Sequence, residues 1–166
     1  MVTGLYGRYE KTLDSKNRVI VPNVFRKRLK DEELILVSWA DRCLALFPAS
    51  RFEEIAADIQ RSQRYTKEAR AMRRQLFSSA FSVEFDSQGR ISVPEHLLQY
   101  GFMNFSKDLV LTGDYDKVEI WPRSRFYEMD EKSRVNFDEF FEKNLSAPVP
   151  EEKTVAPEAD SEDEKE

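Results

Sequence analysis

The chain has 166 residues, of which 40% are hydrophobic and 34% charged, and its formal net charge is −5. No apolar run is long enough to cross a bilayer, and the start has no apolar signal-peptide region, so we expect a cytoplasmic protein without membrane contact. The single cysteine, Cys43, excludes an internal disulfide and favours a reducing compartment. The length suits one compact domain or two small intertwined ones.

The charge is unevenly distributed along the chain. Residues 147–166 contain eight acidic residues and two lysines, a net charge of −6, so residues 1–146 carry +1. Between Arg8 and Lys30, eight basic residues stand against two acidic ones, a local excess of +6. This patch suits contact with phosphate groups and, equally, a solvated charged face. The acidic tail has only valines as large apolar residues, which predicts disorder.

Four sequence windows recur in the same order, which indicates an internal duplication. The paired windows are 14–22 with 86–94, 34–37 with 109–112, 44–47 with 118–121, and 48–55 with 122–129. DSKNRVIVP and DSQGRISVP share five of nine positions, and PASRFEEI and PRSRFYEM share five of eight. Each copy is too small to bury a substantial core alone. We therefore predict a pseudo-twofold pair in which each half covers the apolar face of the other.

The start of each copy has the pattern of a strand that leads into a helix. The β-branched runs at 19–21 and 91–93 end at Pro22 and Pro94, and proline cannot donate to a β-ladder. The alternating residues at 81–85 predict a half-buried strand.

Short helices are expected after both prolines. Phe25 and Leu29 are four residues apart and share one helix face. The second helix contains Leu97 and Leu98 and is predicted to end at Gly101, because glycine is common just after a helix.

A longer helix is expected after each copy's last strand. Ser50 and Glu53 form a capping-box pattern, with an apolar stripe that includes Phe52 and Ile59. Ser124 occupies the equivalent cap position in the second copy.

Two further helices are predicted from apolar stripes. Residues 61–77 suggest a basic amphipathic linker helix capped by Thr66, whose arginines are most simply a solvated face. Residues 136–145 place Phe137, Phe140 and Leu145 on one side of a final docking helix.

Catalytic chemistry has little support in the sequence. His96 is the only histidine and is expected at the surface or as a cap, while Cys43 fits a small core residue. Neither residue belongs to a Cys/His cluster with metal-ligand spacing. We expect no enzyme, no metal, no cofactor and no small-molecule substrate.

The repeated motif Asp-x-x-x-Arg, followed by β-branched residues and Pro, stands at 14–18 and 86–90. Two such motifs 72 residues apart, with the segments at 5–9 and 119–122, resemble the MraZ family of transcriptional regulators over residues 1–130. The sequence departs from the family pattern at Asn17, where glycine is usual, although asparagine also tolerates a left-handed backbone.

The resemblance implies a mainly β fold with α-helices (α+β), built from two AbrB-like swapped-hairpin β-barrel halves in a pseudo-twofold arrangement. The expected segments are a first half at 1–60, a linker helix at 61–77, a second half at 78–130, a C-terminal helix at 131–146 and the acidic tail at 147–166.

Two hairpin tips are the expected site of DNA binding. The residues assigned to DNA are Arg8, Lys16, Asn17, Arg18, Gln88, Gly89 and Arg90, and those assigned to the motif's structure are Asp14, Asp86, Pro22 and Pro94. An arginine fork can contact phosphate or read the edge of guanine. Because Gln88 replaces Lys16, the first tip is expected to contribute more electrostatic affinity. Alternatively, each Asp–Arg pair only holds its turn, and both roles are compatible.

The resemblance also implies a function and an assembly. It predicts a regulator that binds double-stranded DNA at short repeated G-rich sites, in the promoter of its own division and cell-wall gene cluster. It further predicts a ring-shaped homo-oligomer associated with the nucleoid. The alternative is an oligomeric β-barrel interaction or scaffold protein without specific DNA readout, whose basic loops bind acidic protein partners.

Overall fold

The computed structural model describes residues 3–62 and 65–145, so the acidic tail predicted at 147–166 lies outside the described residues. The elements in chain order are β1 (Arg8–Thr12), β2 (Arg18–Ile20), α1 (Asn23–Leu29), β3 (Leu34–Ser38), the 3-10 turn η1 (Ala40–Arg42), β4 (Leu44–Pro48), α2 (Ala49–Arg61), α3 (Lys67–Ser79), β5 (Phe81–Val83), β6 (Arg90–Ser92), α4 (Glu95–Tyr100), β7 (Asp108–Gly113), β8 (Val118–Pro122), α5 (Arg123–Val135) and α6 (Phe137–Leu145).

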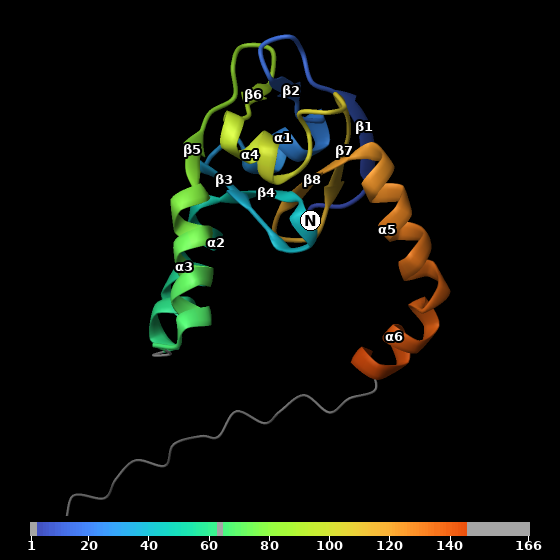
Figure 1. The fold of residues 1–166 in the computed structure, drawn as a ribbon. Helices are drawn as coiled ribbons and strands as arrows, with labels where there is room; N and C mark the ends of the chain where they lie inside the picture. Colours follow the sequence, from blue (N-terminus) through green and yellow to red (C-terminus); the bar gives the residue numbers. More distant parts are fainter. Residues whose placement is uncertain (1–2, 63–64, 146–166) are drawn as a thin grey trace, which may run out of the picture. The chain divides into compact units, whose positions relative to one another are not determined.

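Six strands form one antiparallel sheet in the order β1-β7-β8-β4-β3-β5, and β2 pairs with β6 in a separate two-stranded ribbon (Figure 1). The predicted α+β class and the pseudo-twofold pairing of two copies are confirmed. In the described part of the chain the strands do not close into a barrel, because β1 and β5 each have a neighbour on one side only. The expectation of barrel halves is corrected to an open sheet plus a ribbon.

The two copies exchange strands. β1 of the first copy pairs with β7 of the second, and β5 of the second copy pairs with β3 of the first. The central contact, β4 with β8, also joins the two copies. Neither copy can therefore complete the sheet without the other, as expected for units too small to fold alone.

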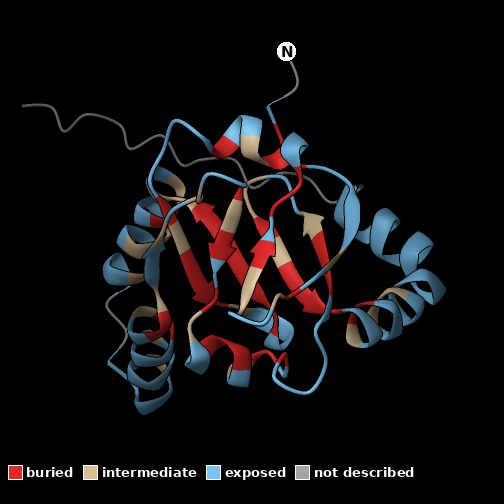
Figure 2. Ribbon diagram, turned by 90° about the horizontal axis from the view of Figure 1, so that it is seen from above, coloured by how far each residue is buried: buried red, intermediate tan, exposed pale blue. Residues whose placement is uncertain are grey.

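The four central strands of the sheet, β3, β4, β7 and β8, are mostly buried, which explains why they read as nearly continuous apolar runs (Figure 2). Along β4, Leu44 and Leu46 belong to the core beneath the β2–β6 ribbon, whereas Ala45 and Phe47 belong to a cluster on the other face. The first core also contains Val19 and Ile91, one from each copy, both fully buried. Burial of each such side chain stabilises the fold by about 1.5–3 kcal/mol.

The outer face of the sheet is covered by helices from each copy. Phe52 of α2 in the first copy and Leu76 of α3, the helix between the copies, pack with Phe47. In the second copy, Phe126 of α5 packs with Trp121. The apolar stripes predicted for α2 and α3 are thus placed against the sheet. Thr66 accepts a hydrogen bond from the Ala69 amide at 3.1 Å, which confirms the predicted cap.

The predicted capping box at the start of α2 is wrong. The Ser50 hydroxyl donates to Glu32 at 2.6 Å, and no side chain caps the helix, which begins directly after Pro48. A carboxylate from an earlier loop therefore takes the hydroxyl that the local pattern assigned to the cap. In the second copy, α5 begins at Arg123, so Ser124 lies inside the helix.

Two other local predictions are refined by the structure. α4 ends at Gly101 as expected, but Gly101 has a φ of −85°, and the left-handed residue is Phe102, at 58°. Gly101 instead provides space, because a Cβ there would lie 3.0 Å from Met103 Cε. In β5, Phe81 is 45% exposed and its ring lies 4.8 Å from the ring of His96, so this strand is less buried than predicted.

Residues 3–130 form one compact unit, and residues 131–145 belong to a second unit. Within the second unit, the ring centroids of Phe137 and Phe141 on α6 are 6.0 Å apart. The large apolar side chains of α6, including Phe140 and Leu145, are exposed.

Candidate nucleic-acid interface

The first hairpin tip is organised by the carboxylate of Asp14. One carboxylate oxygen accepts hydrogen bonds from the amides of Lys16 and Arg18, each at 2.9 Å. The other accepts from Arg18 Nε at 2.7 Å. The Asn17 amide donates to the Asp14 carbonyl at 3.1 Å, and Asn17 has a φ of 58°. The left-handed residue predicted for this turn is therefore present, and asparagine tolerates it.

The second tip repeats this geometry. The Asp86 carboxylate accepts from the amides of Gln88 and Arg90 at 2.9 Å each, and from Arg90 Nε at 2.7 Å. Gly89 closes the turn with a φ of 77°. The three distances equal those of the first tip, so the same motif builds the same brace twice.

The two tips lie side by side because the strands that follow them pair with each other (Figure 1). In the β2–β6 ribbon, Val19 stands opposite Ile91. Backbone hydrogen bonds continue the ribbon beyond these strands, from Val21 to the Gly89 carbonyl at 3.0 Å and from Val93 to the Asn17 carbonyl at 2.9 Å. Each turn residue is thereby attached to the other copy.

The hydrogen bonds at each tip favour the ionised form of its Asp carboxyl. Hydrogen bonding from the Arg18 amide, opposed by desolvation, holds the pKa of the Asp14 carboxyl below its ordinary value of 3.8. The Arg90 amide lowers the pKa of Asp86 in the same way. Each brace uses the Nε of its arginine, and the Arg18 and Arg90 side chains remain 27% and 20% exposed. A guanidinium that is held by Nε can still present its Nη groups to a ligand.

The structure thus brings together six of the seven residues that the sequence assigned to DNA, which are Lys16, Asn17, Arg18, Gln88, Gly89 and Arg90. Lys16 and Gln88 are exposed at the tips. The tips are further connected by an ion pair in which Arg90 Nη1 lies 3.7 Å from Asp14.

The motif prolines lie behind the tips, where each strand passes into its helix. The carbonyl of Pro22 accepts from the Phe25 amide at 2.9 Å, and that of Pro94 accepts from the Leu97 amide at 3.0 Å. Both prolines occupy the N-cap position of their helix. They set the direction in which each chain leaves the ribbon.

Arg8 is placed elsewhere. It begins β1, at the end of that strand away from the hairpin, and its guanidinium donates to both carboxylate oxygens of Asp130 at 3.0 and 3.3 Å. The guanidinium also lies 5.0 Å from the centre of the Phe126 ring. This hydrogen-bonded pairing raises the pKa of Arg8. Its observed contacts connect β1 with α5.

Sequence reasoning missed Arg26, which it counted only as part of the basic patch. In the structure the Arg26 guanidinium lies against Gly89, and its Nε donates to the Val21 carbonyl at 2.9 Å. The sequence offered one indirect signal for this contact. Position 89 is glycine where the first copy has Asn17, which indicates that the second turn needs space for a neighbour in addition to a left-handed backbone.

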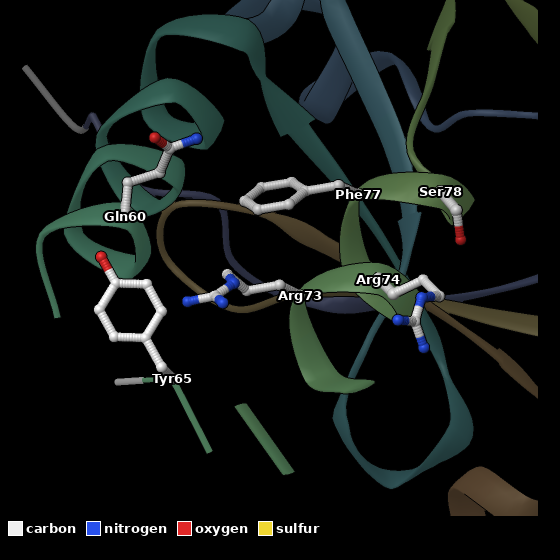
Figure 3. Close-up of a pocket in the computed structure, with 6 residues that line it drawn as sticks. All are labelled: Gln60, Tyr65, Arg73, Arg74, Phe77 and Ser78. Carbon is white, nitrogen blue, oxygen red and sulfur yellow. The ribbon is translucent and has the colours of Figure 1, made fainter. Parts of the chain in front are cut away.

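A separate basic pocket lies between α2 and α3, with a volume of about 490 Å³ (Figure 3). Its lining residues are Gln60, Tyr65, Arg73, Arg74, Phe77 and Ser78. Figure 3 shows the Arg73 side chain extending toward Tyr65, whereas Arg74 extends away from it. The lining of this pocket therefore has two basic residues and no acidic one.

Within residues 3–62 and 65–145, no three His, Cys, Asp or Glu side chains are grouped as a metal site. Among the same residues, no helix is both long and apolar enough to span a membrane. Burial raises the pKa of the Cys43 thiol, so this side chain is held as a neutral core group.

The duplicated Asp-braced hairpins, joined by a ribbon and completed by exchanged strands, define an α+β protein built from two interlocked copies of one unit. The family model described as "MraZ protein, putative antitoxin-like" matches the chain twice, at residues 5–75 and 76–147. The chain therefore belongs to the MraZ family, whose curated members matched here are named transcriptional regulators.

Three relatives show the extent of this similarity. "Transcriptional regulator MraZ" of Clostridium tetani is 34% identical over 137 residues, covering 82% of this chain and 94% of the relative. The protein of the same name from Caldanaerobacter subterraneus subsp. tengcongensis is 35% identical over 138 residues, covering 83% and 94%. That of Pediococcus pentosaceus is 35% identical over 136 residues, covering 82% and 93%.

Proposed function

We propose that this transcription regulator acts by sequence-specific binding to double-stranded DNA, and that the paired hairpin tips form the contact surface. The observation that carries the proposal is the identical Asp14–Arg18 and Asp86–Arg90 brace on two adjacent loops. A braced guanidinium loses less side-chain freedom on binding than a free one. It therefore suits bidentate contact with guanine O6 and N7 in the major groove.

The exposed residues between the braced pairs have separate roles in this proposal. Lys16 is a point charge for a phosphate, while Gln88 can hydrogen-bond to a base or to the backbone. The Asp carboxylates do not face the DNA as free charges, since their oxygens are occupied by two amides and an arginine. The brace and the recognition role are thus compatible, because Asp uses Nε and DNA would use the Nη groups.

One pair of short tips reads only a few base pairs, so useful affinity requires several pairs acting together. We therefore include homo-oligomerisation, as a ring, in the proposal. The targets are repeated short G-rich sites in the promoter of the protein's own division and cell-wall gene cluster, in a cytoplasmic, nucleoid-associated setting. These details rest on family resemblance. The exposed apolar side chains of α6 give the oligomer a contact surface.

The segment boundaries also remain part of the proposal. They are a first half at 1–60, a linker helix at 61–77, a second half at 78–130, a C-terminal helix at 131–146 and a tail at 147–166.

The alternative function is an oligomeric interaction or scaffold protein without specific DNA readout. One observation favours it: both tip arginines already have carboxylate partners, so they satisfy a purely structural role. The two functions differ in their response to DNA sequence and salt. A scaffold should bind random and selected duplexes alike, or neither.

The test begins with selection of bound duplexes from random DNA, followed by titration of the selected duplex against salt. Arg18→Ala is then compared with the wild type by DNA titration and by thermal melt on one preparation. The expected loss is about 1–3 kcal/mol at the selected site, with a smaller loss on random DNA. Arg61→Ala is the matched control, because Arg61 is also paired with a carboxylate, Asp58, on α2.

A correctly assembled Arg18→Ala protein with wild-type affinity would refute base recognition by that residue. Parallel losses of binding and melting temperature would instead support the structural role. Absence of any salt-sensitive duplex binding by the wild type would refute the proposed function as a whole.

A further inference from the structure

The two tips differ in one feature that bears on electrostatic binding. The first has Lys16 beside its braced arginine, whereas the second has the neutral Gln88 at the equivalent position. With only these residues, the second tip would have one cation, Arg90, and that cation is shared with Asp86 and with Asp14 at 3.7 Å. A symmetric pair of DNA contacts would then have unequal affinity for phosphate.

Arg26 brings a second cation to the second tip. It belongs to α1 of the first copy, and its Nε donates to the Val21 carbonyl at 2.9 Å. The amide of Val21 donates in turn to the Gly89 carbonyl at 3.0 Å. Arg26 is therefore seated on the end of the β2–β6 ribbon, directly beside the turn of the other copy.

Gly89 makes room for this guanidinium. A Cβ at position 89 would overlap Arg26 and lie 2.6 Å from its Nε. The first tip shows that glycine is not required for the turn itself, because Asn17 holds the equivalent turn with a φ of 58°. The space at Gly89 thus has a second use, which is to let the Arg26 guanidinium approach the backbone.

No carboxylate in the described residues forms an ion pair with Arg26, whose side chain is half-buried. The position equivalent to Arg26 in the second copy is Leu98, which is 2% exposed and packs in the core. The first tip consequently has no such cation from α4. Each tip then has two cations, Lys16 with Arg18 and Arg26 with Arg90.

We propose that Arg26 is a phosphate-contacting residue of the second tip, replacing across the copies the charge that Gln88 lacks. This inference rests on the proposed binding of duplex DNA and specifies which residue completes its surface. It revises the expectation that the first tip contributes more electrostatic affinity, because the missing lysine is matched by an arginine from another element.

The first test compares the salt dependence of duplex binding for Arg26→Gln and Lys16→Gln. Each should lower the slope of log affinity against log salt by about 0.9, which corresponds to an affinity loss on the order of ten-fold at 0.1 M salt. The matched control is Arg28→Gln, which removes the same charge from the same helix. The Arg28 guanidinium lies 6.0 Å from the centre of the Tyr6 ring and not against the second tip, so Arg28→Gln should leave the slope unchanged.

A second variant removes the contact without removing the charge. Gly89→Asn copies the first tip's turn residue and displaces the Arg26 guanidinium, which is the mobile end of a long side chain. The salt slope of Gly89→Asn should fall as in Arg26→Gln, and the double variant Gly89→Asn with Arg26→Gln should show no further loss of slope. Gln88→Lys in the Arg26→Gln background should restore the wild-type slope, because it places the cation where the first tip has it.

These outcomes separate the inference from the proposed function. Wild-type binding with an unchanged slope in Arg26→Gln would overturn the role of Arg26 and leave duplex binding intact. A wild type that does not bind duplex DNA would overturn the proposed function instead. If Arg26→Gln lowers the melting temperature, Gly89→Asn and the Gln88→Lys rescue still decide: an unchanged slope in the first, or no rescue by the second, refutes the proposal.

Discussion

The two copies are alike at the hairpin tips and differ on the outer face of the sheet. At the tips, the Asp14 and Asp86 braces have equal hydrogen-bond distances. On the outer face, equivalent positions differ in size and charge: Ala45 of β4 corresponds to Glu119 of β8, and Phe47 corresponds to Trp121. The repeats therefore agree where a local motif determines geometry and diverge where only covering the sheet is required.

The carboxylates in the two regions illustrate this difference. Hydrogen bonds lower the pKa of Asp14 and Asp86. Burial raises the pKa of Glu119, although the Trp121 indole donates to it at 3.3 Å. A carboxylate is thus stabilised at the tips and penalised on the outer face, which allows the two regions to be tested separately.

The largest effect is expected from separating the copies. Fragments 1–60 and 78–145 should each fail to give a cooperative thermal melt as a monomer, because β1 and β5 complete the other copy's part of the sheet. Circular dichroism and sedimentation of each fragment, with the full chain as control, provide the measurement. A monomeric fragment with a sharp melt would show that the copies are independent folding units.

A smaller but still large effect is expected in the core beneath the tips. Ile91→Ala should lower the free energy of unfolding by about 2–5 kcal/mol, since the side chain is fully buried where the copies meet. Denaturant unfolding measures the loss. Ile20→Ala, at a position 43% exposed in the same ribbon, should change stability by less than about 0.5 kcal/mol. Equal losses in both variants would contradict the observed burial.

Acid should weaken the tips. Because the folded pKa of Asp14 and Asp86 is below the ordinary value of 3.8, their contribution is present above that value and is lost as pH falls through the lowered pKa. Asp86→Asn removes one carboxyl with a lowered pKa. The number of protons taken up on unfolding between pH 5 and pH 2, which sets the pH dependence of the unfolding free energy, should therefore fall by less than one. Denaturant unfolding across this range measures it, and an unaltered pH profile would argue against the brace.

The outer face should respond with the opposite sign. The folded pKa of Glu119 is raised above its ordinary 4.5, so its contribution is favourable below that value and is lost as pH rises through the raised pKa. Glu119→Gln should therefore raise the melting temperature modestly at pH 7, with a difference that shrinks toward pH 4. A variant less stable than the wild type at pH 7 would show that burial does not penalise the charged form of Glu119.

The smallest effect is expected at the exposed end of the first tip. Lys16→Ala should weaken binding to all duplexes and lower the salt slope by about one unit, because lysine contributes mainly a point charge. Its melting temperature should be unchanged, since the brace uses only the backbone amide of residue 16. A loss limited to one DNA sequence would assign base readout to Lys16.

Features that depend on local spacing were accessible from the sequence. The turns at Asn17 and Gly89 and the short helices after the prolines each involve residues within a few positions of one another, and the duplication was visible because such local patterns recur in the same order. The Asp–Arg pairs were recognised because their partners stand four positions apart in the chain, and both a structural and a DNA-binding role were considered. Such patterns carry their own geometry, since the covalent chain already holds the partners close together.

The tertiary structure alone decided the contacts between distant segments. The local pattern assigned Ser50 to a helix cap, but the folded chain brings Glu32 to its hydroxyl. Charge alone placed Arg8 in a DNA surface, but it meets Asp130, 122 positions away. Arg26 meets Gly89 because β2 of the first copy pairs with β6 of the second, which brings the second turn beside α1. Sequence proximity cannot specify these partners, because burial of apolar faces, not the partners themselves, drives the chain to fold. Many different surface pairings would be compatible with the same buried core.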